Sequence, residues 1–273
     1  MANHLGVDRN GLYRMPLLPD KDKQLKARIE AVLKEHQHYG HRRIAMELGD
    51  AGKNRVRRVM RLYGLTPKMK HGPGWRKPGK NNQAAPDNIL RTQGIVALRP
   101  GHIWAADFTY LKVLGQWFYP ATVIDVFTRE IVGWSLSTRH DAELVVGALY
   151  DALSRHDPPG YLHFDQGSEY LSERHLNLCT EPEITVSASA KDSPWQNGFQ
   201  ERFYGTLKQE LGSLQNIQSQ GALLEHIAIT LNYYNTKRIH TKLKTNPKQF
   251  RQNYEQEQQK QELQHNQRLA SVA

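Results

Sequence analysis

Two stretches decide how this chain is expected to fold: HFDQGSEY at residues 163–170 and SPWQNGFQERF at residues 193–203. Residues 161–164 form a short apolar run, which predicts a buried strand that delivers Asp165 into a glycine-containing turn. The second stretch predicts a turn followed by a helix that carries Glu201. A third acid, Asp107, lies upstream in the middle of a predicted strand. We interpret Asp107, Asp165 and Glu201 as one metal-binding site.

The spacing of these acids is weak support when taken alone. Glu201 lies 36 positions after Asp165, but the chain holds 27 Asp and Glu residues, so such a pair also arises by chance. The usual role of a helical Glu is to face solvent, and that reading of Glu201 stays open. Asp125 and Glu169 are kept as neighbouring acids that compete for the same role.

Charge is distributed unevenly along the chain. The net charge is +10, and residues 1–80 hold 19 Lys and Arg against 7 Asp and Glu, a net of +12. Residues 81–273 therefore carry 18 basic and 20 acidic residues, a net of −2. The basic part is a candidate module for binding a polyanion, and a merely solvated basic surface is the alternative.

Composition excludes several other classes of protein. The single cysteine, Cys179, excludes an internal disulfide and a cysteine-based zinc site, and we expect it to be a packing residue. No apolar run approaches the roughly 20 residues of a membrane span, and the first residues lack a signal-peptide core. These features predict no membrane partner and a cytoplasmic location.

The N-terminal part predicts a helix-turn-helix. A helix after Asp20 or Asp22, a short helix after residues 38–43 and a third helix at residues 55–63 are separated by glycine-containing turns. On the third helix the apolar residues share one face, and the opposite face carries Arg57, Arg58 and Arg61. Such a helix can enter the major groove of DNA, and an ordinary three-helix bundle with a charged exterior is the alternative.

The remainder predicts a basic Pro/Gly linker and an α/β domain. Strands are expected at residues 103–113, 117–126, 131–136, 161–164 and 184–187, with an amphipathic helix at residues 141–153. The pattern predicts a mixed five-stranded sheet with helices on both faces. In the helix after Gly198, a buried stripe is expected at every fourth residue from Phe199 to Leu211, with Glu201 and Lys208 on another face.

These motifs resemble those of the DDE transposases of bacterial insertion sequences, specifically the second-frame product of the family that transposes through a circular intermediate. The resemblance extends to the integrase core superfamily, which includes retroviral integrases, and covers roughly residues 36–250. Its motifs are YGHRRI at 39–44, WAADFT at 104–109, DVFTR at 125–129, IVGW at 131–134, HFDQGSEY at 163–170, SPWQNG at 193–198, ERF at 201–203, LK at 207–208, and Tyr234-Asn235 with Arg238 and His240. At Phe164 the family commonly has a small polar residue.

The resemblance implies an RNase H-like fold in which Asp107, Asp165 and Glu201 hold two Mg²⁺ ions, with Mn²⁺ able to substitute. It implies double-stranded DNA as the partner, both the terminal inverted repeats of the element and the target, and it suggests that Lys208 contacts the terminal DNA. In the basic domain we also expect DNA contacts from Arg42 and Arg43. It also implies a homo-oligomer on DNA, association with the nucleoid and an upstream-frame product as a further partner.

The expected organisation has four parts: a helix-turn-helix domain at residues 1–65, a basic linker at 66–94, a catalytic core at 95–250 and a polar tail at 251–273. The predicted function is Mg²⁺-dependent cleavage and strand transfer of insertion-sequence ends by two-metal phosphoryl transfer. A non-catalytic DNA-binding regulator and a metal-dependent nuclease without joining activity are the two alternatives. The kinds of DNA product distinguish all three.

Overall fold

The computed structural model describes residues 18–68, 88–189 and 198–270, and the chain divides into two compact units, Met1–Met69 and Lys70–Ala273. The first unit holds three helices, α1 (Leu18–Glu35), α2 (His41–Leu48) and α3 (Lys53–Leu62). Apolar side chains from all three helices form its core: Leu25, Ile29, Ile44, Val56 and Val59. The three predicted helices are therefore present.

A buried carboxylate, paired with two half-exposed arginines, joins the first and third helices of this unit. The Asp22 carboxylate is almost fully buried and lies 2.8 Å from the Arg58 guanidinium and 3.6 Å from that of Arg55. Because an unpaired buried carboxylate is costly, the two arginines stabilise the packing of α1 against α3. Arg58 therefore has a structural contact in addition to the DNA contact that the sequence predicts for it.

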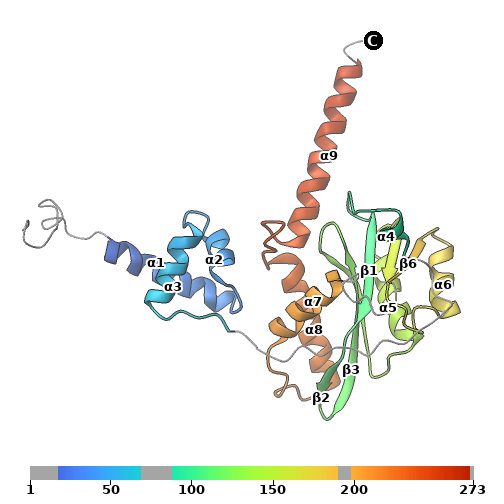
Figure 1. Cartoon of the computed structure of the whole chain (residues 1–273), viewed down its shortest axis with the longest axis horizontal. Coiled ribbons are helices and arrows are strands. Elements are labelled where there is room, and N and C mark those ends of the chain that lie inside the picture. The colour runs from blue at the N-terminus through green and yellow to red at the C-terminus, as the bar shows by residue number, and fades with distance from the viewer. Residues whose placement is uncertain (1–17, 69–87, 190–197, 271–273) are drawn as a thin grey trace, which may run out of the picture. The chain divides into compact units, whose positions relative to one another are not determined.

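The second unit contains a sheet and several helices (Figure 1). Its strands are β1 (Ile103–Phe108), β2 (Leu111–Val113), β3 (Gln116–Asp125), β4 (Ile131–Ser137), β5 (Tyr161–Phe164) and β6 (Thr185–Ala188). Its helices are α4 (Ile89–Thr92), α5 (Ala142–Leu153), α6 (Glu173–Thr180), α7 (Gly198–Leu211), α8 (Gln220–Thr236) and α9 (Pro247–Ala270).

The sheet is mixed, as predicted. Strand order is β2-β3-β1-β5-β6, with β4 on the other side of β3. Strands β1, β5 and β6 are parallel, whereas β3 runs antiparallel to β1, β2 and β4. The parallel arrangement of β1 and β5 matters most here, because it brings their carboxyl ends to the same edge of the sheet.

The described residues contain six strands rather than the predicted five. The segment expected as one strand over residues 103–113 breaks at Thr109 and Tyr110 into β1 and β2. Thr109 lies opposite Pro120 of β3. The Pro120 carbonyl oxygen accepts a hydrogen bond from the Thr109 N–H, but Pro120 has no N–H to donate in return. The ladder loses a hydrogen bond at this point, and β2 pairs only with β3.

Alternate residues of β1 face two separate cores. Trp104, Ala106 and Phe108 pack with α5 and α6, whereas Ile103 and Ala105 pack with α7 and α8. Successive side chains of a strand point to opposite faces of the sheet, so β1 is buried on both faces. Figure 1 shows α5 and α6 on one side of the sheet and α7 and α8 on the other.

Of the residues predicted as a polar tail, 251–270 belong to helix α9, which projects from the unit (Figure 1). The first turns of α9 are anchored, because Phe250 and Tyr254 contact the Phe127 ring and Arg251 pairs with Glu130 at 2.5 Å. Within the described residues, no helix combines the length and apolar character needed to cross a membrane.

We expect Gly133→Ala to destabilise the second unit by about 3 kcal/mol. A Cβ at Gly133 would lie 2.4 Å from the Ala148 carbonyl oxygen and 2.6 Å from the Ala152 Cβ, so α5 would have to move away from β4. The matched control is Gly205→Ala on α7, where nothing lies within 4 Å and helix propensity predicts a gain of up to about 1 kcal/mol. Denaturant unfolding followed by circular dichroism measures both, and equal stabilities for the two variants would contradict the packing described.

Candidate active site

Asp107 and Asp165 lie at neighbouring ends of two parallel strands. Strand β1 pairs with β5 in the register Trp104–Leu162 and Ala105–His163. When this register is continued by two residues, Asp107 lies beside Asp165. Side chains two residues apart share a face of a sheet, so Asp107 and Asp165 lie on the same face as Ala105 and His163. The sheet therefore brings together two of the three predicted acids, although 57 residues separate them in the sequence.

The helix that carries Glu201 is fixed to the same strand by a buried polar network. The Gln200 side chain is fully buried, and its amide nitrogen donates to the carbonyl oxygens of Ala105, at 2.6 Å, and Thr122, at 3.0 Å. The Thr122 hydroxyl donates to the Gln200 side-chain oxygen at 3.1 Å. One turn later, the Tyr204 hydroxyl donates to the carbonyl oxygen of Asp107. Helix α7 is thus bonded to the backbone of the residue that supplies the first acid.

Glu201 itself is exposed on α7. Across residues 18–68, 88–189 and 198–270, no three His, Cys, Asp or Glu side chains come close enough together to hold a metal ion. The strand register places two of the predicted acids at neighbouring strand ends, and the third stands on a helix that is hydrogen-bonded to β1 and β3. The stretch SPWQNG that leads into α7 lies largely outside the described residues.

The buried face of α7 differs from the predicted one. Phe199, expected in the buried stripe, is 41% exposed, and the Arg129 guanidinium lies 4.1 Å above its ring. The stripe starts instead at Gln200 and continues through Phe203, Tyr204, Leu207 and Leu211. Both sets of positions fit helical spacing, so periodicity favours the more apolar residue, Phe199, whereas hydrogen bonds to the sheet select Gln200.

Two buried tyrosines lie beneath the acids. Burial raises the pKa of the Tyr170 and Tyr204 hydroxyls well above its usual value, and the negative charges of Asp107 and Asp165 add to the effect. Both hydroxyls therefore stay protonated.

A lysine, Lys208, and a further carboxylate, Glu169, lie near Asp107 and Asp165. Burial lowers the pKa of Lys208, and the charge of Asp107 opposes that change, so the ammonium lies within electrostatic reach of the first acid. Glu169 lies near Asp165, because a Cβ added at Gly167 would be 2.7 Å from a Glu169 carboxylate oxygen and 3.0 Å from one of Asp165. Glu169 also pairs with His140 at 2.8 Å.

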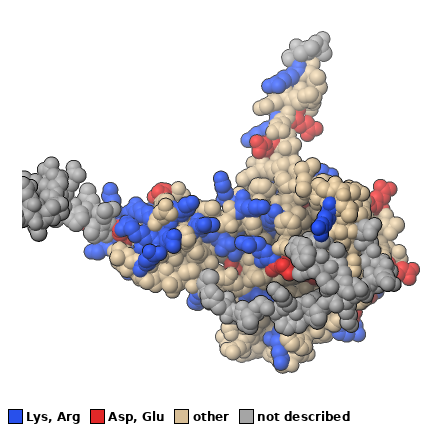
Figure 2. All heavy atoms as spheres, in the orientation of Figure 1, with Lys and Arg blue, Asp and Glu red and all other residues tan. Residues whose placement is uncertain are grey.

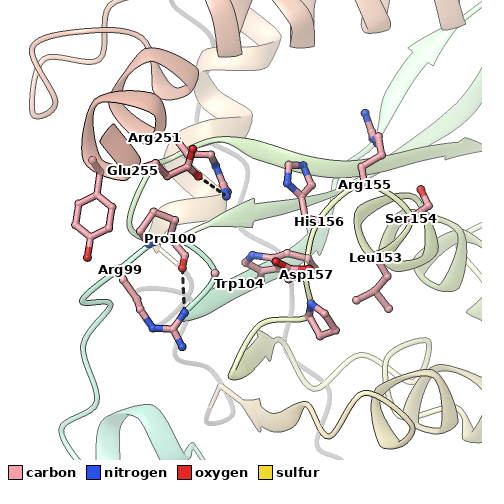
Figure 3. Close-up of a pocket in the computed structure, with 13 residues that line it drawn as sticks. Arg99, Pro100, Trp104, Leu153, Ser154, Arg155, His156, Asp157, Arg251 and Glu255 are labelled. Carbon is pink, nitrogen blue, oxygen red and sulfur yellow. Dashed lines mark hydrogen bonds and ion pairs between the residues drawn. The ribbon is translucent and has the colours of Figure 1, made fainter. Parts of the chain in front are cut away.

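Asp125, the other neighbouring acid, has a structural role. Its carboxylate is fully buried and accepts hydrogen bonds from the N–H groups of Gly101, Phe127 and Thr128, at 2.6 to 2.9 Å. In the sheet it pairs with Trp104, at the opposite end of β1 from Asp107. A pocket of about 670 Å³ opens at that end, lined among others by Trp104, His156 and Arg251 (Figure 3). This pocket is therefore separate from the acids.

The first unit carries a basic surface on its second and third helices (Figure 2). Arg42, Arg57 and Arg61 are exposed, whereas Arg43 is partly buried with its guanidinium 5.7 Å from the Tyr39 ring centre. Burial lowers the pKa of His41, and the positive charges of Arg57, Arg42 and Lys53 lower it further. The starts of α2 and α3 therefore share one region of positive charge.

Comparisons with known proteins identify the class of this chain. The integrase core domain family matches residues 97–194 and again 183–247, and an HTH-like domain family matches residues 19–72. The fold class predicted from the sequence, an RNase H-like core preceded by a helix-turn-helix domain, is thereby confirmed. The matched residues define an integrase-type polynucleotidyl transferase with a helical domain before it.

Curated relatives narrow this class to one family. The transposase for insertion sequence element IS904 of Lactococcus lactis is 34% identical over 88% of this chain and 98% of its own length. The putative transposase InsK for insertion sequence element IS150 of Escherichia coli is 34% identical over 83% of this chain and 82% of its own. The chain belongs to the family of insertion-sequence transposases with an integrase core.

A solved structure agrees in fold. A chain of the simian T-cell lymphotropic virus intasome, in complex with a PP2A regulatory subunit, is 19% identical with a TM-score of 0.51. The match covers 82% of this chain and 74% of that chain.

Replacing Gln200 by Ala should lower the free energy of unfolding by about 2–3 kcal/mol, because two buried carbonyl oxygens lose their donor. The matched control is Gln209→Ala on the same helix, a partly exposed position where we expect little change. Denaturant unfolding compares the variants, and hydrogen exchange of the α7 amides shows whether the helix loosens. A Gln200→Ala protein as stable as the control would contradict the anchoring role.

Acid should destabilise the fold through His175. Burial lowers the pKa of this side chain to about 4, although its ring nitrogen Nδ1 donates to the Tyr170 carbonyl oxygen at 2.9 Å, which opposes the change. The unfolded chain binds the proton at a higher pH than the folded chain, so stability falls as pH drops from about 6.5 to about 4, by up to about 1.4 kcal/mol per pH unit.

His175→Asn keeps a donor for the Tyr170 carbonyl but cannot titrate in this range. Its unfolding free energy should therefore fall less steeply over the same pH interval, when measured by urea unfolding at several pH values. His265→Asn, at an exposed position on α9, is the control. Equal slopes for the wild type and His175→Asn would show that His175 is not responsible.

Proposed function

We propose that this chain catalyses metal-dependent cleavage and strand transfer of insertion-sequence DNA ends, with Asp107, Asp165 and Glu201 as the metal-binding acids. The observation that supports this proposal most strongly is the placement of Asp107 and Asp165 at adjacent ends of parallel β1 and β5. Helix α7, which carries Glu201, is bonded to the Asp107 backbone through Tyr204.

The chemistry of these side chains fits Mg²⁺, with Mn²⁺ as a substitute. Mg²⁺ prefers oxygen ligands and is commonly held by one or two protein carboxylates together with water and phosphate oxygens. A pair of carboxylates at one edge of the sheet, with a third on a neighbouring helix, provides such donors. When bound, two such ions supply activation of the attacking oxygen and stabilisation of the leaving oxygen.

The surrounding residues hold the acids and the DNA strand. Tyr170 and Tyr204 stay neutral, so they add no charge to a site that already carries several carboxylates. Lys208, on the same helix as Glu201, lies one turn after Tyr204, whose hydroxyl donates to the Asp107 carbonyl oxygen, and its ammonium binds a phosphate next to the reacting one. Cys179 is buried with its pKa raised to about 12, so the reaction uses no protein thiolate.

We assign DNA binding to the first unit, with Arg42, Arg43, Arg57, Arg58 and Arg61 facing the terminal inverted repeats or target DNA. Two DNA ends must meet for transposition, so we propose a homo-oligomer on DNA, in the cytoplasm at the nucleoid, with an upstream-frame product as a further partner. In this assignment residues 1–65 bind DNA, 66–94 link, 95–250 catalyse and 251–273 are a polar extension.

Strand transfer by purified protein, with candidate element-end duplexes and Mg²⁺ or Mn²⁺, tests the proposal. Asp165→Asn and Glu201→Gln should each lower joined product by about a hundredfold or more, because transition-state charge loses its stabilisation, while DNA binding is kept. The matched controls are Asp157→Asn, at the other end of the sheet, and Glu225→Gln on α8, both exposed.

The kind of product separates the alternatives. Free ends without joined strands, from protein that binds DNA, would indicate a nuclease. Binding without any metal-dependent product, even after addition of the upstream-frame product, would indicate a regulator and would contradict the proposal.

A further inference from the structure

The β2–β3 hairpin presents a lysine and a tryptophan on its outer face. Lys112 and Trp117 are direct cross-strand partners, and the Lys112 ammonium lies 5.8 Å from the centre of the Trp117 ring. The tight turn between the strands uses Leu114 and Gly115, both with positive φ, at 54° and 78°. Two consecutive residues with positive φ match the twist of a two-residue hairpin, so this pair is held in a defined place.

A second aromatic residue and a second lysine continue this surface. The Tyr110 ring meets the Trp117 ring edge to face, with centres 5.5 Å apart. The Lys208 ammonium, from helix α7, lies 4.6 Å from the centre of the Tyr110 ring. We call these four side chains the aromatic–lysine ladder: Lys208, Tyr110, Trp117 and Lys112.

The aromatic–lysine ladder begins at the acids. Tyr110 follows Asp107 by three residues, and Lys208 lies one helical turn after Tyr204, whose hydroxyl donates to the Asp107 carbonyl oxygen. Its other end, at Lys112 and Trp117, is near the tip of the hairpin. A DNA strand whose reacting phosphate lies at Asp107 therefore has this surface next to it.

The hairpin does not need Trp117 for its core. Leu111, Val113 and Phe118 are buried and hold the hairpin against the core shared with α7 and α8. Trp117, on the outer face, remains 46% exposed. An exposed tryptophan next to lysines is a common arrangement in proteins that bind single strands, since a base stacks on the ring and phosphates pair with the ammonium groups.

Along an intact duplex, no base face is available to stack on the aromatic rings of this surface. Its base faces are covered by stacking, and only unpaired nucleotides at an end or at an opened step can place a base on a protein ring.

We propose that the aromatic–lysine ladder binds unpaired nucleotides of the DNA strand adjacent to the reacting phosphate, with a base stacked on Trp117 or Tyr110 and phosphates paired with Lys112 and Lys208. This inference rests on the proposed function, because it places the DNA strand at Asp107. The ladder holds the strand end open and limits its re-pairing.

Binding of the full chain to DNA without metal tests the ladder independently of catalysis. Fluorescence anisotropy in EDTA compares a blunt duplex with a duplex of the same length that carries a single-stranded tail of about four nucleotides. The wild type should prefer the tailed duplex. Trp117→Ala should lose about five- to tenfold in affinity for the tailed duplex, the effect of one lost base stack, and little for the blunt one.

Two further variants test whether the aromatic ring of Trp117 causes the preference for tailed DNA. Trp117→Phe keeps an aromatic ring and should restore most of the preference for the tail. Tyr150→Ala removes another exposed aromatic side chain, 66% exposed on α5, and should leave the preference unchanged. A 5-iodouracil placed in the tail should cross-link on irradiation to Trp117 or Tyr110, as mapped by mass spectrometry.

The proposal would be overturned if Trp117→Ala kept the wild-type ratio of affinities for tailed and blunt DNA, whether or not both affinities fell. The outcome is separate from that of the strand-transfer test. A wild type that joins DNA but shows no preference for a tail would overturn the ladder alone. A wild type that prefers the tail but never cuts or joins would overturn the catalytic proposal and keep the ladder.

Discussion

The hydrogen bonds of one buried glutamine hold the two halves of the candidate active site together. Gln200 places its amide nitrogen between the carbonyl oxygens of Ala105 and Thr122, on two neighbouring strands. A helix that packed on this face by apolar contacts alone could slide or rotate, because such contacts are not directional. Directional bonds to two strands fix both the position and the rotation of α7, and hence the face on which Glu201 and Lys208 lie.

The sheet supplies the second constraint. Parallel pairing of β1 with β5 brings Asp107 and Asp165 to one edge, where carboxylates repel each other without a cation. The same edge is bordered by neutral tyrosines, by Lys208 and by the Glu169–His140 pair. In the proposed function, strand β1 and helix α7 hold Asp107 and Glu201 in place, and preorganisation of this kind reduces the cost of assembling a reactive site.

Local patterns predicted the mixed sheet, the strand before Asp165 and the helix after Asp141, because apolar periodicity and capping residues are local signals. These local patterns gave wrong predictions where contacts between residues far apart in the sequence determine the structure. The break at Thr109 depends on Pro120 in the neighbouring strand, and the burial of Gln200 in place of Phe199 depends on carbonyl groups of two other strands. Asp125 looked like a member of the site, yet its oxygens bind nearby N–H groups at the other end of β1.

The meeting of Asp107 and Asp165 at one metal-binding edge is the central claim, and a crystal structure of the full chain soaked in Mn²⁺ tests it most directly. The anomalous signal of manganese locates the ion independently of the protein density. The account predicts a peak at about 2.2 Å, a typical metal–oxygen distance, from a carboxylate oxygen of both Asp107 and Asp165. A peak bound only at Glu169 and His140, or well-ordered Asp107 and Asp165 carboxylates with no peak between them, would contradict it.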